Sequence, residues 1–179
     1  SYYTQIRQID NLLADPASGM SPARQDFFSG IQEVASNPAY LPARQEALSS
    51  AESLAARLQG LAGRLDEIEQ GVNSQILSSV GSINTYAQQI ASLNDAIGRA
   101  QRATGQPANA LLDQRDQLIL ELNKEIKTTV VKQGDGNYNV FIGNGQPLVV
   151  GTTTYQLANV VSPTNPERIE VAFRASSGD

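Results

Sequence analysis

The feature that most constrains this chain is a helical apolar pattern that continues without a break from about Pro42 to Ile97. Its apolar residues recur mostly in steps of three and four, which places them along one side of a single helix. We call this set the apolar row: Leu54, Leu58, Leu61, Leu65, Ile68, Val72, Ile76, Val80, Ile83, Tyr86 with Ala87, Ile90, Leu93 and Ile97. No proline interrupts the stretch after Pro42, and Pro42 suits a first helical turn because its missing N–H is not needed there.

The predicted helix is unusually long. At 1.5 Å per residue it spans roughly 80 Å, whereas helices of globular domains average about 11–12 residues. Such a helix is typical of a strut or an assembly element rather than of the wall of an active site. The apolar row is most simply explained as an intrachain core, and the alternative is that part of it faces another subunit.

The row has two irregularities. Between Ile68 and Val80 its steps are all four residues, and a stutter of this kind locally unwinds a left-handed supercoil. Four glycines also lie inside the predicted helix, each of which costs about 1 kcal/mol relative to alanine if exposed. They are Gly60, Gly63, Gly71 and Gly81. We keep four explanations open: local tolerance, a bend near Gly71, close approach of a neighbouring helix, or a break into two helices.

Two shorter helices are predicted before the long one. Residues 2–13 have a helical period, and residues 15–19 break it. The second helix is expected to begin with Ser21 as N-cap and Pro22 as its first residue, and to end at Asn37-Pro38. Its predicted packing face consists of Phe27, Phe28, Ile31, Val34 and Ala35. Because the link to Pro42 is short, the long helix is expected to return beside this one.

A last helix is predicted after a turn at residues 105–107. Asn109 is a plausible N-cap, and Asp113 and Asp116 are expected in the opening turns, where carboxylates suit the positive end of the helix dipole. The predicted apolar face consists of Leu112, Leu118, Ile119, Leu122 and Ile126. The short loop favours antiparallel packing against the end of the long helix.

From about residue 126 the pattern is that of short strands. Turns are predicted at Gly134–Asn137 and at Gly143–Gly145, the second of the Asn-Gly hairpin kind. The predicted strands are residues 129–131, 138–142, 148–150, 155–161 and 168–173. They form an antiparallel meander of hairpins. Because five short strands make a marginal sheet, the β-region is expected to be small or cut off at Asp179.

These patterns together predict an α+β fold with two domains. Residues 1–127 are expected to form an elongated antiparallel helical rod with one very long helix, and residues 128–179 a small β-hairpin-rich domain. The chain of 179 residues carries 13 basic and 18 acidic side chains, a net charge of −5, and no basic stripe, which argues against a nucleic-acid or anionic-membrane partner. No apolar run approaches the roughly 20 residues of a membrane span, and no signal peptide is visible.

The residue types also limit the chemistry. The sequence has no Cys and no His, which excludes thiol nucleophiles, Cys/His zinc sites and imidazole catalysis. Asp113 and Asp116 in Asp113-Gln114-Arg115-Asp116 could in principle hold a divalent cation or act as an acid–base pair. Dipole compensation and local pairing with Arg115 explain them fully. Gly134–Asn137 lacks the later ligands of a calcium loop, and Gly143–Gly145 is followed by neither a lysine nor a helix. We therefore expect no catalytic, cofactor-binding or metal-binding residues, and no enzyme.

Several short sequence motifs point to a particular protein family more specifically than the chemistry of their residues does. Asn37-Pro38 is followed by Arg44, and the stretch from Asn84 to Ile97 contains Ile90-Ala91-Ser92-Leu93-Asn94. The later phrases are Asn109-Ala110-Leu111-Leu112-Asp113-Gln114-Arg115-Asp116-Gln117-Leu118 with Glu121-Leu122, then Asp135-Gly136-Asn137-Tyr138-Asn139-Val140, then Gly143-Asn144-Gly145-Gln146-Pro147-Leu148-Val149. In this order they resemble the bacterial flagellar hook-associated protein 1 (FlgK) family over nearly the whole chain.

The resemblance implies both a fold and a function. It implies a helical D1 domain built on a long helix, a β-rich D2 domain, and a structural role at the hook–filament junction of the extracellular flagellum. The implied partners are the hook protein, the next junction protein FlgL, neighbouring copies of the chain, and the export chaperone FlgN through the family's C-terminal region. Export through the flagellar type III apparatus without a cleaved signal is implied as well.

Residues 1–179 are expected to be an interior fragment without the family's terminal D0 segments and without the C-terminal helix that completes D1. Alone, this fragment is expected to be monomeric. Two other hypotheses were weighed: a non-enzymatic coiled-coil module of another secreted or secretion-system appendage, and a peptidoglycan-acting enzyme. The phrase from Asp113 to Asp116 and the Asn144-Gly145 phrase favour the flagellar reading over the first. The missing set of convergent acid, base and pocket residues argues against the second.

Overall fold

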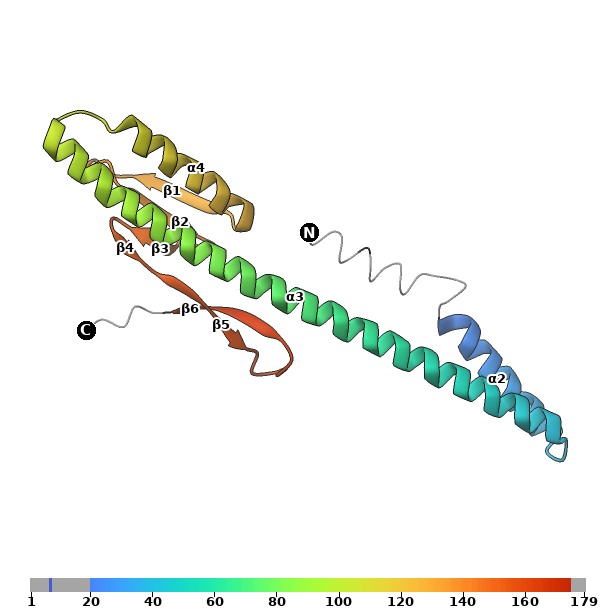
Figure 1. Cartoon of the computed structure of the whole chain (residues 1–179). Helices are drawn as coiled ribbons and strands as arrows, with labels where there is room; N and C mark the ends of the chain where they lie inside the picture. The colour runs from blue at the N-terminus through green and yellow to red at the C-terminus, as the bar shows by residue number, and fades with distance from the viewer. Residues whose placement is uncertain (1–6, 8–19, 175–179) are drawn as a thin grey trace. The chain divides into compact units, whose positions relative to one another are not determined.

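The computed structural model describes residue 7 and residues 20–174. The helix predicted at residues 2–13 and the break at residues 15–19 lie outside the described residues, apart from Arg7. The fold is α+β, with one long helix and antiparallel strands (Figure 1). By their contacts the residues form two compact units, 1–71 and 72–179, and the long helix α3 (Leu41–Thr104) contributes to both.

The prediction of one very long helix is confirmed. α3 is a single α-helix of 64 residues, so the alternative of a break into two helices is wrong. It continues seven residues beyond Ile97, because the segment that follows is rich in good helix formers although it leaves the apolar row. The helix ends at Thr104, and the next residue, Gly105, has a positive φ of 67° and an N–H that donates to the Gln101 carbonyl at 2.8 Å.

In the first unit, α2 (Met20–Ser36) packs beside the start of α3 through a tight turn (Figure 1). The turn is held by the Tyr40 N–H, which donates to the Asn37 carbonyl at 3.0 Å. The predicted end at Asn37-Pro38 is confirmed. The helix begins at Met20, however, so Ser21 and Pro22 lie inside its first turn and Ser21 is not the N-cap.

The predicted packing face of α2 is partly wrong. Ala23 and Gly30 are the buried residues of this helix, whereas Phe28, Ile31 and Ala35 are exposed and Phe27 and Val34 only half-buried. The physical reason is close approach. A Cβ added to Gly30 would lie 3.1 Å from the Cα of Ala47, so small residues make the contact and the large apolar side chains are left outside it.

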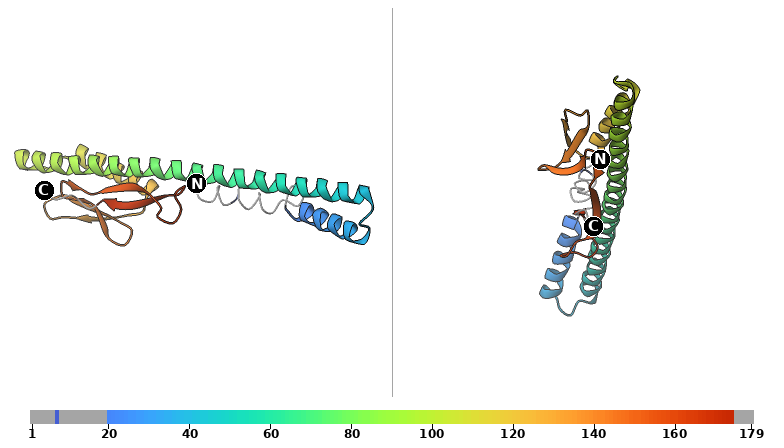
Figure 2. Two further views of the ribbon diagram at one scale, coloured as in Figure 1. Left: turned by 90° about the horizontal axis from the view of Figure 1, so that it is seen from below. Right: turned by 90° about the vertical axis from the view of Figure 1, so that its left-hand side faces the viewer.

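In the second unit, α4 (Asn109–Glu125) returns beside α3, as Figures 1 and 2 both show. Its N-cap is Ala108, whose carbonyl accepts hydrogen bonds from the N–H groups of Leu111 and Leu112. The prediction of Asn109 as N-cap is therefore wrong by one position. The first turn of α4 contains no acidic residue, and Asp113 begins only its second turn.

The strands lie along one side of the C-terminal half of α3 (Figure 2). Four of them form an antiparallel sheet in the order β1-β2-β3-β4: β1 (Thr128–Lys132), β2 (Tyr138–Ile142), β3 (Gln146–Val150) and β4 (Thr153–Thr154). A separate antiparallel hairpin is made by β5 (Gln156–Val161) and β6 (Ile169–Arg174). All five predicted strands are present; β2 has the predicted bounds, and the other four are shifted by one or two residues.

The meander differs from the prediction in two ways. The sheet is split into two, and the two-residue strand β4 was not predicted. β4 follows a reversal at Gly151, whose φ is +59°, and pairing then stops after Thr154. Two residues are too few to show an alternating pattern, so the sequence carried no signal for this strand. The turns at Gly134–Asn137 and Gly143–Gly145 are both confirmed.

One core holds the second unit together. It is formed by Val80, Ile83, Ala87, Ile90, Ala91, Leu122, Val140, Ile142, Leu148, Val149 and Leu157, from α3, α4 and the strands. The intrachain-core interpretation of the apolar row thus holds from Val80 onward. Between Leu54 and Val72 no member of the row is buried, and Leu58 and Leu65 are 48% and 42% exposed. That this part faces another subunit stays a prediction, as does the division into domains 1–127 and 128–179.

The four glycines that the sequence places inside the predicted long helix have open space around them among the described residues. A Cβ added at Gly60, Gly63, Gly71 or Gly81 would meet no described atom within 4 Å outside the helix's own adjacent backbone. Close approach of another helix of this chain is therefore not the reason for them among the described residues. A bend near Gly71 stays a prediction.

Candidate functional site: the junction between the long helix and the strands

Three asparagines of α3 bind the backbone of the strands through both atoms of the side-chain amide. Asn73 Nδ2 donates to the Glu167 carbonyl at 2.6 Å, and its Oδ1 accepts the Ile169 N–H at 2.9 Å. Asn84 binds the carbonyl and the N–H of Leu157, both at 2.9 Å. A primary amide offers one acceptor and two donors, so it imitates the peptide group of a neighbouring strand.

The third member, Asn94, is completely buried. Its Nδ2 donates to the carbonyls of Tyr138 at 2.9 Å and Gly151 at 2.6 Å, and its Oδ1 accepts the Tyr138 N–H at 3.2 Å. Asn73, Asn84 and Asn94 lie ten or eleven residues apart, close to three helical turns, so they share one side of α3. We call these three residues the asparagine row.

Arg115 connects α4 to the same contact between α3 and the strands. Its Nη1 donates to Asn94 Oδ1 at 2.8 Å and to the Gly136 carbonyl at 2.9 Å, and its guanidinium lies 3.5 Å from the centre of the Tyr138 ring. The side chain is only 1% exposed, and its Nε has no hydrogen-bond partner among the residues that the structure describes. The prediction that Arg115 pairs locally with the aspartates of its own helix is wrong. Arg115 lies seven residues from Leu122 on the inward face of α4, so it points into the unit.

The turn that meets Arg115 is organised by Asp135. Its carboxylate accepts the Asn137 N–H at 2.9 Å and the Asn137 side-chain N–H at 2.7 Å. Gly136 has a φ of +83°, a conformation that favours glycine, and this geometry turns its carbonyl towards Arg115. The segment Gly134–Asn137 was compared above with a calcium loop. Here the Asp135 carboxylate stabilises the turn by accepting both hydrogen bonds from Asn137.

The remaining acidic residues considered as metal ligands do not come together in one site. Within residues 20–174, no group of three or more acidic side chains is placed to hold a metal ion, and no helix is long and apolar enough to cross a membrane. Asp116 lies near Lys132 of β1. The pKa of Lys132 is raised above its ordinary value, first by a hydrogen bond with Tyr138, then by the charge of Tyr138 and of Asp116.

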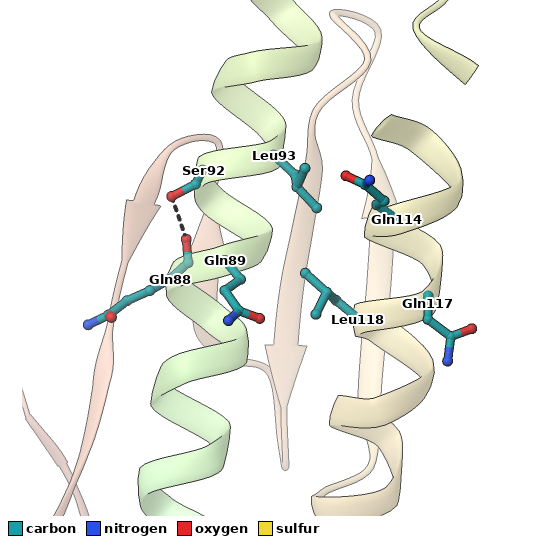
Figure 3. Close-up of a pocket in the computed structure, with 7 residues that line it drawn as sticks. All are labelled: Gln88, Gln89, Ser92, Leu93, Gln114, Gln117 and Leu118. Atoms are coloured by element: carbon teal, nitrogen blue, oxygen red, sulfur yellow. Dashed lines mark hydrogen bonds between the residues drawn. The ribbon is translucent and has the colours of Figure 1, made fainter. Parts of the chain in front are cut away.

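A shallow groove of about 710 Å³ lies between α3 and α4. In Figure 3, Leu93 and Leu118 point towards each other between the two helices, with glutamine side chains around them. The lining consists of Gln88, Gln89, Ser92, Leu93, Gln114, Gln117 and Leu118, none of which is charged. Such a lining offers amides and apolar contact but no acid, base or nucleophile activated by a base.

Known proteins share both the sequence and the fold. Residues 6–179 match the family described as "Flagellar hook-associated protein FlgK helical domain". The chain belongs to the FlgK family. It is 44% identical to the flagellar hook-associated protein 1 of Salmonella typhimurium and 41% identical to that of Escherichia coli K12, in both cases over 96% of this chain and 31% of the relative. A Bacillus subtilis relative is 24% identical over 78% of this chain.

The solved structure of the flagellar hook junction protein FlgK from Burkholderia pseudomallei has the same fold. Its TM-score is 0.88 at 40% identity, over 99% of this chain and 31% of that one. The family resemblance read from the sequence and the predicted α+β fold are thus confirmed. The chain spans about a third of the length of the FlgK proteins it matches.

Sequence reasoning missed the asparagine row and the inward position of Arg115. A signal existed for Asn94, which lies at helical spacing between Ile90 and Ile97 and is therefore a polar residue within an apolar side of the helix. A buried amide in such a place needs partners. The sequence could not name them, because they are backbone groups of strands that follow more than forty residues later.

Proposed function

We propose that this chain is part of a structural subunit that joins the flagellar hook to the filament. The observation that carries the proposal is family membership over residues 6–179, with a FlgK structure of TM-score 0.88 over 99% of the chain. Its role is mechanical rather than enzymatic: the subunit repeats around the flagellar axis and transmits load through packed helices. Heterologous contacts repeated around an axis generate helical assemblies.

The proposed partners are the hook protein, FlgL and neighbouring copies. Exposed apolar side chains support such contacts, because apolar patches on a surface mark interaction sites. In the first unit these are Phe28, Ile31, Tyr40, Leu41, Leu48, Leu58 and Leu65. The proposed location is the extracellular flagellum, reached through the type III export apparatus with FlgN as chaperone.

The proposal is tested by deleting the gene that encodes the chain. We expect cells with hooks that lack attached filaments, flagellin released into the medium, and no swimming. Reintroducing the intact gene restores filaments and is the control for secondary effects. Normal filaments in the deletion strain, seen by electron microscopy, would refute the junction role.

A further inference from the structure

The β5–β6 hairpin is attached to its unit differently from the other strands. It forms a sheet of its own and pairs with none of β1–β4. Only Leu157 of this hairpin belongs to the buried core, with Phe173 partly packed against it, whereas Val160, Val161 and Val171 are exposed. A two-stranded hairpin is at best marginally stable alone in water, so its attachment to α3 decides whether it keeps its place.

That attachment uses the outer edges of both strands of the hairpin. The Ser162 N–H donates to the Arg168 carbonyl across the hairpin at 2.9 Å. In an antiparallel pair, N–H groups point alternately towards and away from the partner strand, so this bond determines the direction of every other N–H in the hairpin. The N–H groups of Leu157 and Ile169 consequently point away from the partner strand. These are the groups that Asn84 and Asn73 bind, so α3 covers two points of strand edge through side-chain amides.

Burial increases along the asparagine row. Asn73 makes one bond that is exposed to solvent, to the Glu167 carbonyl, and one that is partly buried, with the Ile169 N–H. Both bonds of Asn84 to Leu157 are partly buried, and Asn94 is completely buried and shared with Arg115. Water replaces an exposed hydrogen bond at little free-energy cost, whereas a buried one is lost only if the surrounding core opens. The three attachments therefore differ in strength in the order Asn73, Asn84, Asn94.

We propose that the β5–β6 hairpin detaches from α3 stepwise, first at Asn73 and then at Asn84, while the β1–β4 sheet stays on the helix through Asn94. The pivot is the short connection after β4, where the Tyr155 N–H donates to the Leu148 carbonyl at 2.9 Å. This inference does not depend on the proposed junction role.

Native-state hydrogen exchange of residues 1–179, followed by NMR, tests the order of opening directly. Each asparagine accepts one backbone N–H, from Ile169, Leu157 and Tyr138 respectively. We expect Ile169 to exchange fastest, Leu157 next and Tyr138 slowest. If all three amides exchange with the same opening free energy, the hairpin does not detach separately and the proposal is overturned.

The variant Asn84→Ala tests whether the amide holds the hairpin. It removes two hydrogen bonds, so exchange of the amides in residues 156–174 should accelerate on the order of tenfold, while the Val140 amide stays unchanged. Asn123→Ala is a matched control, because Asn123 Oδ1 accepts the Thr128 N–H at 3.0 Å on β1 rather than on the hairpin. Equal acceleration of the hairpin and of Val140, as in global unfolding, overturns the proposal. If Asn84→Ala does not fold, Asn73→Ala, at a half-buried position, replaces it, and the same outcomes support or overturn the proposal.

Discussion

At the scale of single residues, Arg115 shows how one side chain can connect three elements. It reaches from α4 to Asn94 on α3 and to the Gly136 carbonyl in the turn between β1 and β2. Its partners are neutral, and the face of the Tyr138 ring supplies a further favourable electrostatic contact. The guanidinium is thus a hydrogen-bonding bracket rather than half of an ion pair.

Replacing Arg115 by alanine should destabilise the second unit strongly. The change leaves Asn94 Oδ1 and the Gly136 carbonyl each short of a donor and opens a cavity beside Tyr138. We expect a loss of about 3 kcal/mol in the free energy of unfolding, measured by urea titration. Arg99→Ala is the control, because the Arg99–Asp95 ion pair lies at the surface and should matter by less than about 0.5 kcal/mol. A loss no larger than that of the control contradicts the bracket role.

Glu121 gives a prediction about pH. Its hydrogen bond to Lys124 at 2.7 Å lowers the pKa of the Glu121 carboxyl below 4.5. A lowered pKa in the folded state means that the carboxylate stabilises the fold above the unfolded pKa, and that this contribution is lost as pH falls through the folded pKa. The difference in unfolding free energy between the wild type and Glu121→Gln should therefore be present at pH 7 and shrink as the pH falls through the lowered pKa of Glu121. A difference that grows on acidification would have the wrong sign.

At the scale of elements, the periodicity of apolar residues predicted the type and the position of the helices and strands. The steps of three and four predicted α3, and alternation between turn residues predicted β2 to the residue. The contacts between these elements were harder to predict from the sequence. The α2 face was misjudged because apolar size was taken as the guide, whereas Gly30 lets the helices approach through small residues. The asparagine row could not be predicted, because its partners are backbone groups brought near only by the tertiary fold.

Two glycines of different surroundings give opposite predictions. A Cβ at Gly30 would meet the Cα of Ala47 at 3.1 Å, whereas a Cβ at Gly60 would meet nothing within 4 Å. Gly30→Ala should destabilise the pairing of α2 with α3 by about 1 kcal/mol, and Gly60→Ala should stabilise α3 by about 0.5–1 kcal/mol. Hydrogen exchange in α2 and thermal unfolding followed by circular dichroism measure the two effects. Stabilisation by both alanines would rule out close approach at Gly30.

At the scale of the whole molecule, one helix supplies two kinds of surface. From Val80 onward the apolar row is core, whereas its members Leu58 and Leu65 remain substantially exposed. An exposed apolar row adds little to the stability of this chain but is suited to contact with another subunit. We propose that the first part of α3 serves assembly, whereas its later part holds the strands.

Polar substitutions in the exposed part of the row separate these two roles. Leu58→Gln with Leu65→Gln should change the free energy of unfolding of this chain by less than about 1 kcal/mol, yet reduce the number of filaments when introduced into the intact gene. Val80→Gln is the contrasting variant, because Val80 is buried and its replacement should unfold the second unit. Normal filament numbers with the double variant would show that this part of α3 makes no assembly contact.

The most direct test of the central claim is to locate the chain in the assembled flagellum. We would image isolated hook–filament complexes by electron cryo-microscopy and fit the long helix and its strands into the density. The account predicts a ring of copies between the last hook subunits and the first filament subunits, with α3 in contact with neighbouring copies. Density for the chain elsewhere, or no copy at the junction, would contradict it.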